Sequence, residues 1–399
     1  RSTPKPSSAA SDVYKRQNYS WNVGYSNTDG IDSQTGAQPD KDGYDNTSLT
    51  VRWTRPLDAE NDLNVSLLHA NGNTAFDNAW AGESVVHDSD YTQQVLNFRL
   101  NHANKKGWLG KVQFGRSLDN SETFADGVSD GKFDTTRFQL NGQLDWPIGG
   151  QHLLTVGSDY SKESVDSSVT YDIDERSNLA VFLQWQGAHG VHNYVAGARV
   201  DDNEQFGTHA TGNVDYALDL TSGYRLNMGY GTAFKSPSFN DLYYPGYGTP
   251  TLDVETSASL EIGLSGDSYG AHWSIRAFQT RIKDLIGYDP VTWASVNIDK
   301  ARINGIEFEW DRLVTTGLLK NWEIGASLML SDPIDRSTNK RLPRRSKEVV
   351  QLDLDRRHQS SRYGLNLQYH GNRYDDKAND SQLDSYALIH GYYVYESVS

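Results

Sequence analysis

Apolar and polar residues alternate with a period of two along most of the chain. In "RFQLNGQLDW" (137–146), Phe138, Leu140, Leu144 and Trp146 share one face while amides and an acid share the other. The same pattern recurs at 224–230, 322–330 and 363–369. A helix would spread these apolar residues around its whole circumference, whereas a strand places them on one side. The pattern therefore predicts β-strands with one apolar and one polar face.

Aromatic residues often stand at the ends of the apolar face, as Tyr224 and Tyr230 do around Leu226 and Met228. This order is typical of a lipid-facing band between two aromatic girdles. Short and long connections also alternate, as they do in outer-membrane barrels. We expect short turns near 266–270, 311–320 and 356–361, and long loops near 235–256, 284–300, 331–346 and 374–384.

These features predict an all-β fold, a transmembrane antiparallel β-barrel. About eighteen strands are counted from residue 19 onward, each long enough for a crossing of ~9–11 residues. The alternative is a soluble β-sandwich or solenoid. Sandwiches have shorter strands, and the sequence has no self-similar period of ~20–50 residues. No domain boundary is evident between residues 18 and 399.

Composition narrows the function classes. The chain has 399 residues, no cysteine and a net charge of −15. Disulfides and thiolate metal sites are therefore excluded, and the acidic balance argues against nucleic acid as a partner. No window approaches the ~20 apolar residues of a spanning helix.

The two ends of the sequence carry expectations of their own. Residues 1–17, "RSTPKPSSAASDVYKRQ", resemble translated adaptor sequence, so we expect the native segment to span 18–399. The last residues, "YALIHGYYVYESVS", stop within a strand-like run, so we expect a fragment at both ends.

Enzymatic motifs find little support. Lys235-Ser236 lacks the glycine spacing of a phosphate loop, and Pro237 follows directly, so the end of a strand is the simpler interpretation. The sequence has no H-E-x-x-H pair. We do not expect an enzyme.

Two predicted loops are rich in oxygen ligands. The first holds Asp29, Asp32, Gln38, Asp40, Asp42 and Asp45, and the second holds Asp77, Asp88 and Asp90. Calcium takes six to eight such ligands, although "DKDG" lacks the glutamate of an EF-hand. The alternative is a solvated acidic rim. The basic run "RLPRRSKE" (341–348) is a candidate contact for lipopolysaccharide or ligand, or is simply solvated.

The segment "FKSPSFNDLYYPGYGTPTLDVETSASLEIG" (234–263) resembles a mid-barrel signature of TonB-dependent outer-membrane receptors. The following "RIKDLIGYD" and "KARINGIEFEW" resemble that family's next hairpin. Within the family the chain most resembles cobalamin receptors, through "ARVDDNEQFGTH", "LPRRSKE" and "GNRYDDK". The resemblance implies a 22-stranded barrel, of which about eighteen strands are present, with an N-terminal plug that this chain lacks.

The resemblance also implies site residues. Its calcium ligands fall at Gln38, Asp40, Asp42, the carbonyl of Phe76, Asp77 and Asp88, with Asp90 as an alternative to Asp88 and Asp29 or Asp32 as a further ligand. Substrate contacts fall at Asn78 and Arg344. Two other family contacts, a tyrosine and a threonine, fall at Ala378 and near Lys132, so they are not preserved.

The resulting expectation is a monomeric receptor of the bacterial outer membrane. It would take up cobalamin or a related corrinoid, powered by TonB through the missing N-terminal region, with calcium ordering its loops and lipid and lipopolysaccharide around it. A siderophore or haem receptor on the same scaffold, a passive porin and a soluble surface adhesin are the alternatives.

Overall fold

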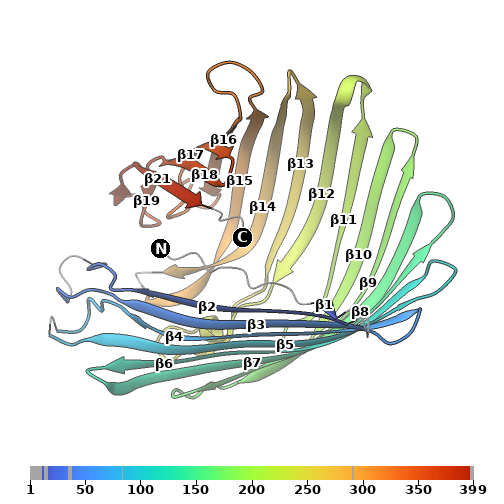
Figure 1. The fold of residues 1–399 in the computed structure, drawn as a ribbon. Helices are drawn as coiled ribbons and strands as arrows, with labels where there is room; N and C mark the ends of the chain where they lie inside the picture. Colours follow the sequence, from blue (N-terminus) through green and yellow to red (C-terminus); the bar gives the residue numbers. More distant parts are fainter. Residues whose placement is uncertain (1–10, 13–16, 35–37, 83, 290–291, 396–399) are drawn as a thin grey trace. The chain divides into compact units, whose positions relative to one another are not determined.

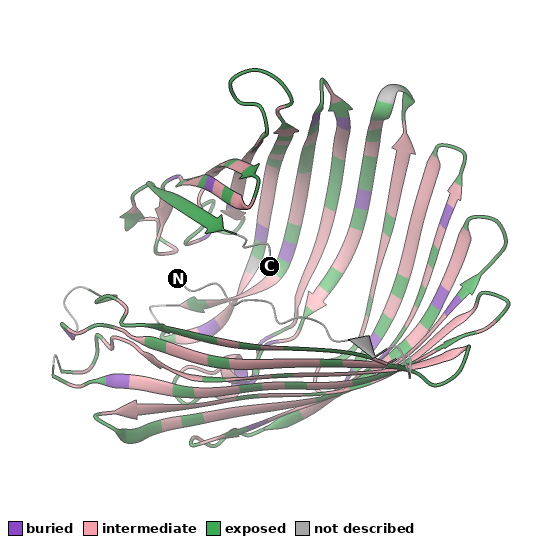
Figure 2. Ribbon diagram, in the orientation of Figure 1, coloured by how far each residue is buried: buried purple, intermediate pink, exposed green. Residues whose placement is uncertain are grey.

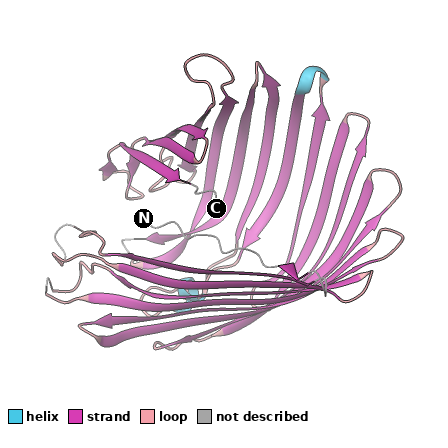
Figure 3. Cartoon of the chain, in the orientation of Figure 1, coloured by secondary structure: helices cyan, strands magenta, loops and turns pink. Residues whose placement is uncertain are grey.

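The computed structural model describes residues 11–12, 17–34, 38–82, 84–289 and 292–395. Strands dominate this part of the chain, with only a 3-10 turn, η1 (Thr221–Gly223), and one short helix, α1 (Phe239–Tyr243), between them (Figure 3). None of the described helices has the length and hydropathy needed to cross a membrane.

The chain divides into two compact units. Unit 1 comprises Arg1–Gln184, Arg199–Ala210 and Ser238–Pro250, and unit 2 comprises Trp185–Ala198, Thr211–Pro237 and Thr251–Ser399. The strands β9 (Glu175–His189), β10 (His192–Asn203) and β11 (Gly207–Asp219) contribute residues to both units.

Unit 1 is built from long antiparallel strands, each paired with the next along the chain. They are β2 (Gln17–Thr28), β3 (Tyr44–Pro56), β4 (Asn61–Ala75), β5 (His87–Ala103), β6 (Leu109–Ala125), β7 (Val128–Pro147) and β8 (His152–Ser167). The short β1 (Ser11–Asp12) pairs with β2.

Unit 2 repeats this up-and-down order, and its neighbouring strands run side by side (Figure 1). Its strands are β12 (Tyr224–Lys235), β13 (Glu255–Ser268), β14 (Ala271–Asp289), β15 (Ala294–Leu313), β16 (Trp322–Asp335), β17 (Glu348–His358), β18 (Ser361–His370) and β21 (Tyr386–Tyr395). A small separate hairpin pairs β19 (Arg373–Tyr374) with β20 (Gln382–Leu383).

The register gathers the apolar residues on one face of the sheet. In unit 2, Met228, Ile262 and Ala277 stand opposite one another on β12, β13 and β14. In unit 1, Phe98, Phe114 and Leu140 do the same on β5, β6 and β7. We call this side the apolar face and the other the polar face. Large side chains of the apolar face are exposed, with Ile262 at 48% and Leu140 at 50%. Figure 2 shows that exposed and intermediate residues make up most of the strands, with few buried ones between them.

The buried clusters are correspondingly small. One joins Val165, Tyr171 and Phe239, and another joins Ile282, Ala301 and Leu342. Soluble proteins bury the apolar face of a sheet and rarely expose a continuous apolar patch of more than a few hundred Å². The exposed face therefore favours the membrane interpretation over a soluble sandwich.

The predicted strand count is confirmed, because β2 through β18 and β21 are eighteen strands of ten residues or more. The predicted turns near 266–270, 311–320 and 356–361 are present. The predicted long loop at 284–300 is wrong. There β14 and β15 continue to pair through Leu285↔Ile298 and Asp289↔Ala294. Gly287 lies within this ladder, opposite Val296.

Within the family signature (234–263), residues Phe239–Tyr243 form α1. The Ser238 hydroxyl accepts a hydrogen bond from the Asp241 amide, and the Asp241 carboxylate accepts from the Ser238 amide, which is a capping box. Phe239 and Leu242 are buried beneath this turn. The Arg176 guanidinium lies over the Phe239 ring at 4.6 Å, so the signature is fixed by packing.

Candidate functional site

Two loops of unit 1 carry most of the predicted ligands. They are 29–43, between β2 and β3, and 76–86, between β4 and β5; we call them the first loop pair. Pairing of β3 with β4 brings their bases together, and the Ala75 amide donates to the Gly43 carbonyl at 2.9 Å. The Phe76 amide donates to the His87 carbonyl at 3.1 Å.

Gln38 joins the two loops. Its side chain is almost fully buried, at 3% exposure. Its Oε1 accepts from the Asn78 amide at 2.8 Å, and its Nε2 donates to the carbonyls of Gly82 at 2.9 Å and Asn78 at 3.3 Å. One side chain therefore satisfies three backbone groups of the opposite loop, and it brings the predicted residues Gln38 and Asn78 together.

Asp77 reaches back across the same interface. Its Oδ2 accepts from the Gln34 amide at 2.8 Å and from the Ser33 hydroxyl at 3.2 Å. Its Oδ1 is buried and, within the described part of the chain, has no hydrogen-bond partner. A buried carboxylate oxygen without a donor is costly, because its lost hydration is not replaced.

Asp42 belongs to the same network through Ser33, whose amide donates to Asp42 Oδ2 at 2.8 Å. Gly30 fixes the loop here, because its φ is +69° and a Cβ at Gly30 would lie 1.8 Å from the Asp42 carbonyl oxygen. Asp40 is half-buried nearby in sequence, whereas Asp29 and Asp32 are exposed.

Asp88 is engaged elsewhere. Its Oδ2 and the Oδ1 of Asp90 both accept from the Asn73 amide group, at 2.6 and 2.8 Å. Among the described residues, no three acidic, histidine or cysteine side chains converge as a metal cluster. The structure thus joins Gln38, Asp42, Asp77 and Asn78 and leaves Asp88 in a separate contact.

Sequence analysis missed two members of this region, Ser33 and His87. His87 is 4% exposed, its ring lies 5.7 Å from that of Phe76, and both of its ring nitrogens lack a described partner. Serine in a polar loop and one histidine among eleven carry no distinguishing sequence signal. Only the fold shows that they line the loop pair.

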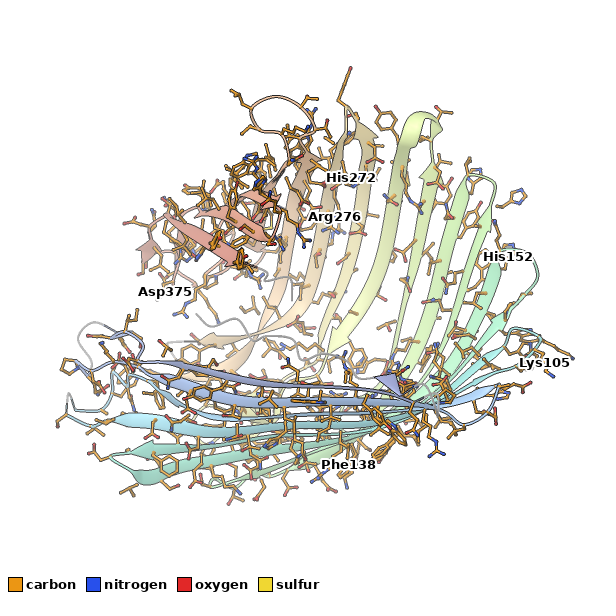
Figure 4. The ribbon with its side chains drawn as sticks, viewed as in Figure 1. Lys105, Phe138, His152, His272, Arg276 and Asp375 are labelled. Atoms are coloured by element: carbon orange, nitrogen blue, oxygen red, sulfur yellow. The ribbon has the colours of Figure 1, made fainter. Side chains whose placement is uncertain are left out.

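Two loops of unit 2, 336–347 and 371–385, form the second loop pair and hold Arg344. Its backbone is left-handed at φ +58°, and its amide donates to the Tyr374 carbonyl at 2.6 Å. Its Nε donates to Asp375 Oδ1, also at 2.6 Å, while its side chain remains 75% exposed. Figure 4 labels Asp375 on this loop. The predicted substrate contact therefore already has a partner that the sequence did not reveal.

The rest of the second loop pair is tied down by its own polar groups. The Arg341 amide donates to Asn379 Oδ1 at 2.8 Å, and Asn379 Nδ2 donates back to the Arg341 carbonyl at 3.0 Å. The Lys340 ammonium donates to the carbonyl of Ala378, the position that lacks the family's tyrosine. Backbone amides, first that of Ser381, hold the pKa of the Asp376 carboxyl below its usual range.

The comparisons with known proteins decide the family. The profile described as "TonB dependent receptor-like, beta-barrel" matches residues 8–395, nearly the whole chain. The chain belongs to this family. The receptors of this family are proteins of the outer membrane, and the strand architecture described above agrees with that assignment.

Relatives differ in what their names say they transport. The chain is 28% identical, over 91% of its length, to a protein of Photobacterium profundum named vitamin B12 transporter BtuB. A ferric enterobactin receptor, PfeA, of Pseudomonas aeruginosa has a TM-score of 0.77 at 15% identity over 97% of this chain and 69% of its own. A copper transporter, OprC, has a TM-score of 0.74 at 16% identity over 96% of this chain and 68% of its own.

The structural neighbours establish the receptor fold and leave the cargo open, because one fold hosts many ligands. The chain spans 60% of the length of the vitamin B12 transporter that it matches. The activity of the whole receptor is therefore a matter for proposal.

Proposed function

We propose that the receptor containing this chain imports cobalamin or a related corrinoid across the outer membrane, energised by TonB. The observation that carries the proposal is the similarity to a vitamin B12 transporter over 91% of the chain. Asn78, held by Gln38 on the first loop pair, and exposed Arg344 on the second are the proposed corrinoid contacts.

Charge supports a corrinoid over a ferric siderophore. The described residues of the first loop pair carry five aspartates and a single lysine, Lys41. Ferric catecholate siderophores are anionic, so such acidic loops would repel them. A corrinoid is nearly neutral, so the same loops would not repel it.

We further propose that calcium orders the first loop pair. The buried Oδ1 of Asp77 has no described hydrogen-bond partner and can act as an oxygen ligand. Gln38 Oε1 keeps a second lone pair in addition to the one that accepts from Asn78. Gln38, Asp40, Asp42, Asp77, the Phe76 carbonyl and Asp88 would hold the ion. Asp88 would first exchange its bond to Asn73. An ordered loop pair loses less entropy when it binds a ligand, so calcium and corrinoid would strengthen each other's binding.

The test is corrinoid binding by the receptor produced from its complete gene, titrated with and without calcium. Calcium should tighten corrinoid binding, and the double substitution of Asp40→Ala and Asp42→Ala should remove that gain. Tight binding of ferric enterobactin instead would refute the corrinoid assignment. Corrinoid binding that ignores calcium would refute only the metal site.

TonB dependence needs its own measurement. Corrinoid uptake should disappear in cells that lack TonB, while binding at the cell surface persists. Uptake that continues in those cells would support the passive porin alternative.

A further inference from the structure

Four cations face one another across β14 and β15. The register places Arg281 directly opposite Arg302 and Lys283 directly opposite Lys300. Residues directly opposite in an antiparallel pair point to the same side of the sheet, with Cβ atoms ~4.5–5.5 Å apart. We call these residues the basic quartet. Like charges in such positions destabilise a sheet, so their alignment requires a reason.

The basic quartet lies on the apolar face. Along the same two strands, that face begins with Trp273 opposite Trp310 and continues with Ile275 opposite Phe308. Ala277 opposite Ile306 and then Gln279 opposite Asn304 follow before the first arginine pair. Ile275 and Ile306 are 43% and 48% exposed. The face thus changes from apolar to amide to cationic toward the 290–293 connection.

No described carboxylate neutralises the basic quartet. On β13 its opposite neighbours are Ala258 and Thr256. On β16, Ile334 stands opposite Arg302, and the acid Asp332 stands opposite Asn304, one pair away from the arginines on that face. The backbone of Arg336 lies beside the quartet, because its amide donates to the Lys300 carbonyl at 2.8 Å.

The polar face of the same strands is different. There Arg276, labelled in Figure 4, forms ion pairs with Glu261 at 3.5 Å and with Glu307. On the apolar face Arg281 has only a neutral acceptor, Gln279 Oε1 at 2.8 Å, and the Arg302 Nε is buried without a described partner. The strands therefore match charge on one face and leave it unmatched on the other.

The position of the basic quartet along the strands fits the edge of a membrane. Lys283 lies ten residues beyond Trp273 on β14. At ~3.4 Å per residue and a tilt of ~40°, this distance is about 26 Å along the membrane normal, close to the ~25 Å apolar band of such barrels. If the tryptophan pair marks one girdle, the lysine pair reaches the opposite interface, and the arginine pair lies just beneath it.

We infer that the basic quartet binds the phosphates of a phosphorylated glycolipid in the outer leaflet. The quartet lies toward the same strand ends as the long loops 236–254 and 336–347, which face outward in outer-membrane barrels. Guanidinium groups bind phosphate oxygens through two parallel hydrogen bonds, and lysines add point charges. An anionic headgroup would offset the like-charge repulsion and would complete the bonding of Arg302 Nε.

The first test uses the unaltered receptor, purified in detergent from its complete gene. Two quantities are measured: the midpoint of thermal unfolding, from a melting curve, and the lipids that remain bound, by native mass spectrometry. Each is compared after addition of lipopolysaccharide, dephosphorylated lipopolysaccharide or inorganic phosphate. Only the phosphorylated glycolipid should bind and raise the midpoint. An equal effect of the dephosphorylated lipid, or of inorganic phosphate alone, would overturn the inference.

The second test removes charge while keeping a polar, hydrogen-bonding side chain. The double substitution of Arg281→Gln and Arg302→Gln should weaken glycolipid binding about 30-fold, at ~5-fold for each cation near a charged membrane surface. The matched control replaces Arg312, which lies on the same face at the opposite end of β15, and Lys320 in the following turn, also with glutamine.

The control should bind glycolipid as the unaltered receptor does. Heat-modifiable gel mobility verifies that each variant is folded. A folded double variant that retains full glycolipid affinity, or a control that loses as much, would refute the site. The Arg281→Lys and Arg302→Lys pair should show an intermediate loss, because charge remains without the guanidinium fork.

Discussion

The first and second loop pairs are held together in opposite ways. Within the first, one buried side chain, Gln38, makes three of the contacts, and a carboxylate oxygen of Asp77 is left without a partner. Within the second, reciprocal bonds between Arg341 and Asn379 and the ion pair of Arg344 satisfy the loops internally. A region with unmet bonding is one that a ligand can complete. We therefore expect the order of the first pair to depend on a bound ligand more than that of the second.

The substitution Gln38→Ala tests this difference between the two loop pairs most strongly. The change removes the hydrogen-bond partner of two carbonyls and one amide. Each of these groups that stays buried without a partner costs ~1–3 kcal/mol of stability. We expect corrinoid affinity in calcium to fall by a factor of about 100, measured by equilibrium titration. The matched control is Gln34→Ala, because Gln34 is exposed and bonds through its backbone amide. Equal losses in both variants would show that Gln38 has no special role.

The next largest effect is expected for Asp77→Asn. An amide at this position keeps one acceptor for Ser33 and Gln34 but replaces the vacant carboxylate oxygen with a donor, which cannot ligate a cation. Calcium affinity should fall about tenfold or more by calorimetry, while stability in a chelator should be unchanged or higher. A variant that binds calcium as the parent does would exclude Asp77 as a ligand.

Arg344→Ala tests the second loop pair. Its ion pair with Asp375 is exposed, so its loss should change stability by no more than ~1 kcal/mol. Corrinoid affinity should nevertheless fall about 5- to 10-fold, with calcium affinity unchanged. The neighbouring Arg345→Ala is the control, and a similar fall there would indicate a general charge effect.

The smallest effect concerns pH. The Asp376 carboxyl has a pKa lowered by backbone hydrogen bonds, chiefly from Ser381, so folding stabilises its ionised form. That contribution is present above the pKa of the unfolded chain and is lost as pH falls below about 4. Amide exchange at Asp380 and Ser381 should therefore accelerate on acidification, beyond its intrinsic pH dependence. In Asp376→Asn this additional dependence should disappear.

Strands and family were predictable because their signals are local. Alternation such as that of Phe138 and Leu140 requires only one exposed apolar face, and the 234–263 signature is contiguous. The prediction of a loop at 284–300 was wrong because the pairing of Leu285 with Ile298 and of Gly287 with Val296 extends both strands. In this segment the pairing of β14 with β15 outweighs the local preference of the sequence for a loop.

The site was less predictable because it depends on register and on loop path. Nothing in the sequence shows that Gln38 lies against Asn78, forty residues away, or that Arg344 is already paired with Asp375. The alignment of Arg281 with Arg302 likewise appears only when β14 and β15 are paired. The capping box of Ser238 and Asp241, in a helix only one turn long, was not predicted either.

The extended pairing of β14 and β15 has a practical consequence for detecting the receptor on living cells. From Lys283 the ladder continues six residues to Asp289, about 20 Å along the strand and roughly 15 Å along the membrane normal. The paired part of the hairpin would therefore continue as a hydrogen-bonded stalk beyond the proposed membrane edge. An epitope tag inserted between Asp289 and Ala294 would be displayed above the bilayer, away from both loop pairs in sequence, and would be accessible to an antibody.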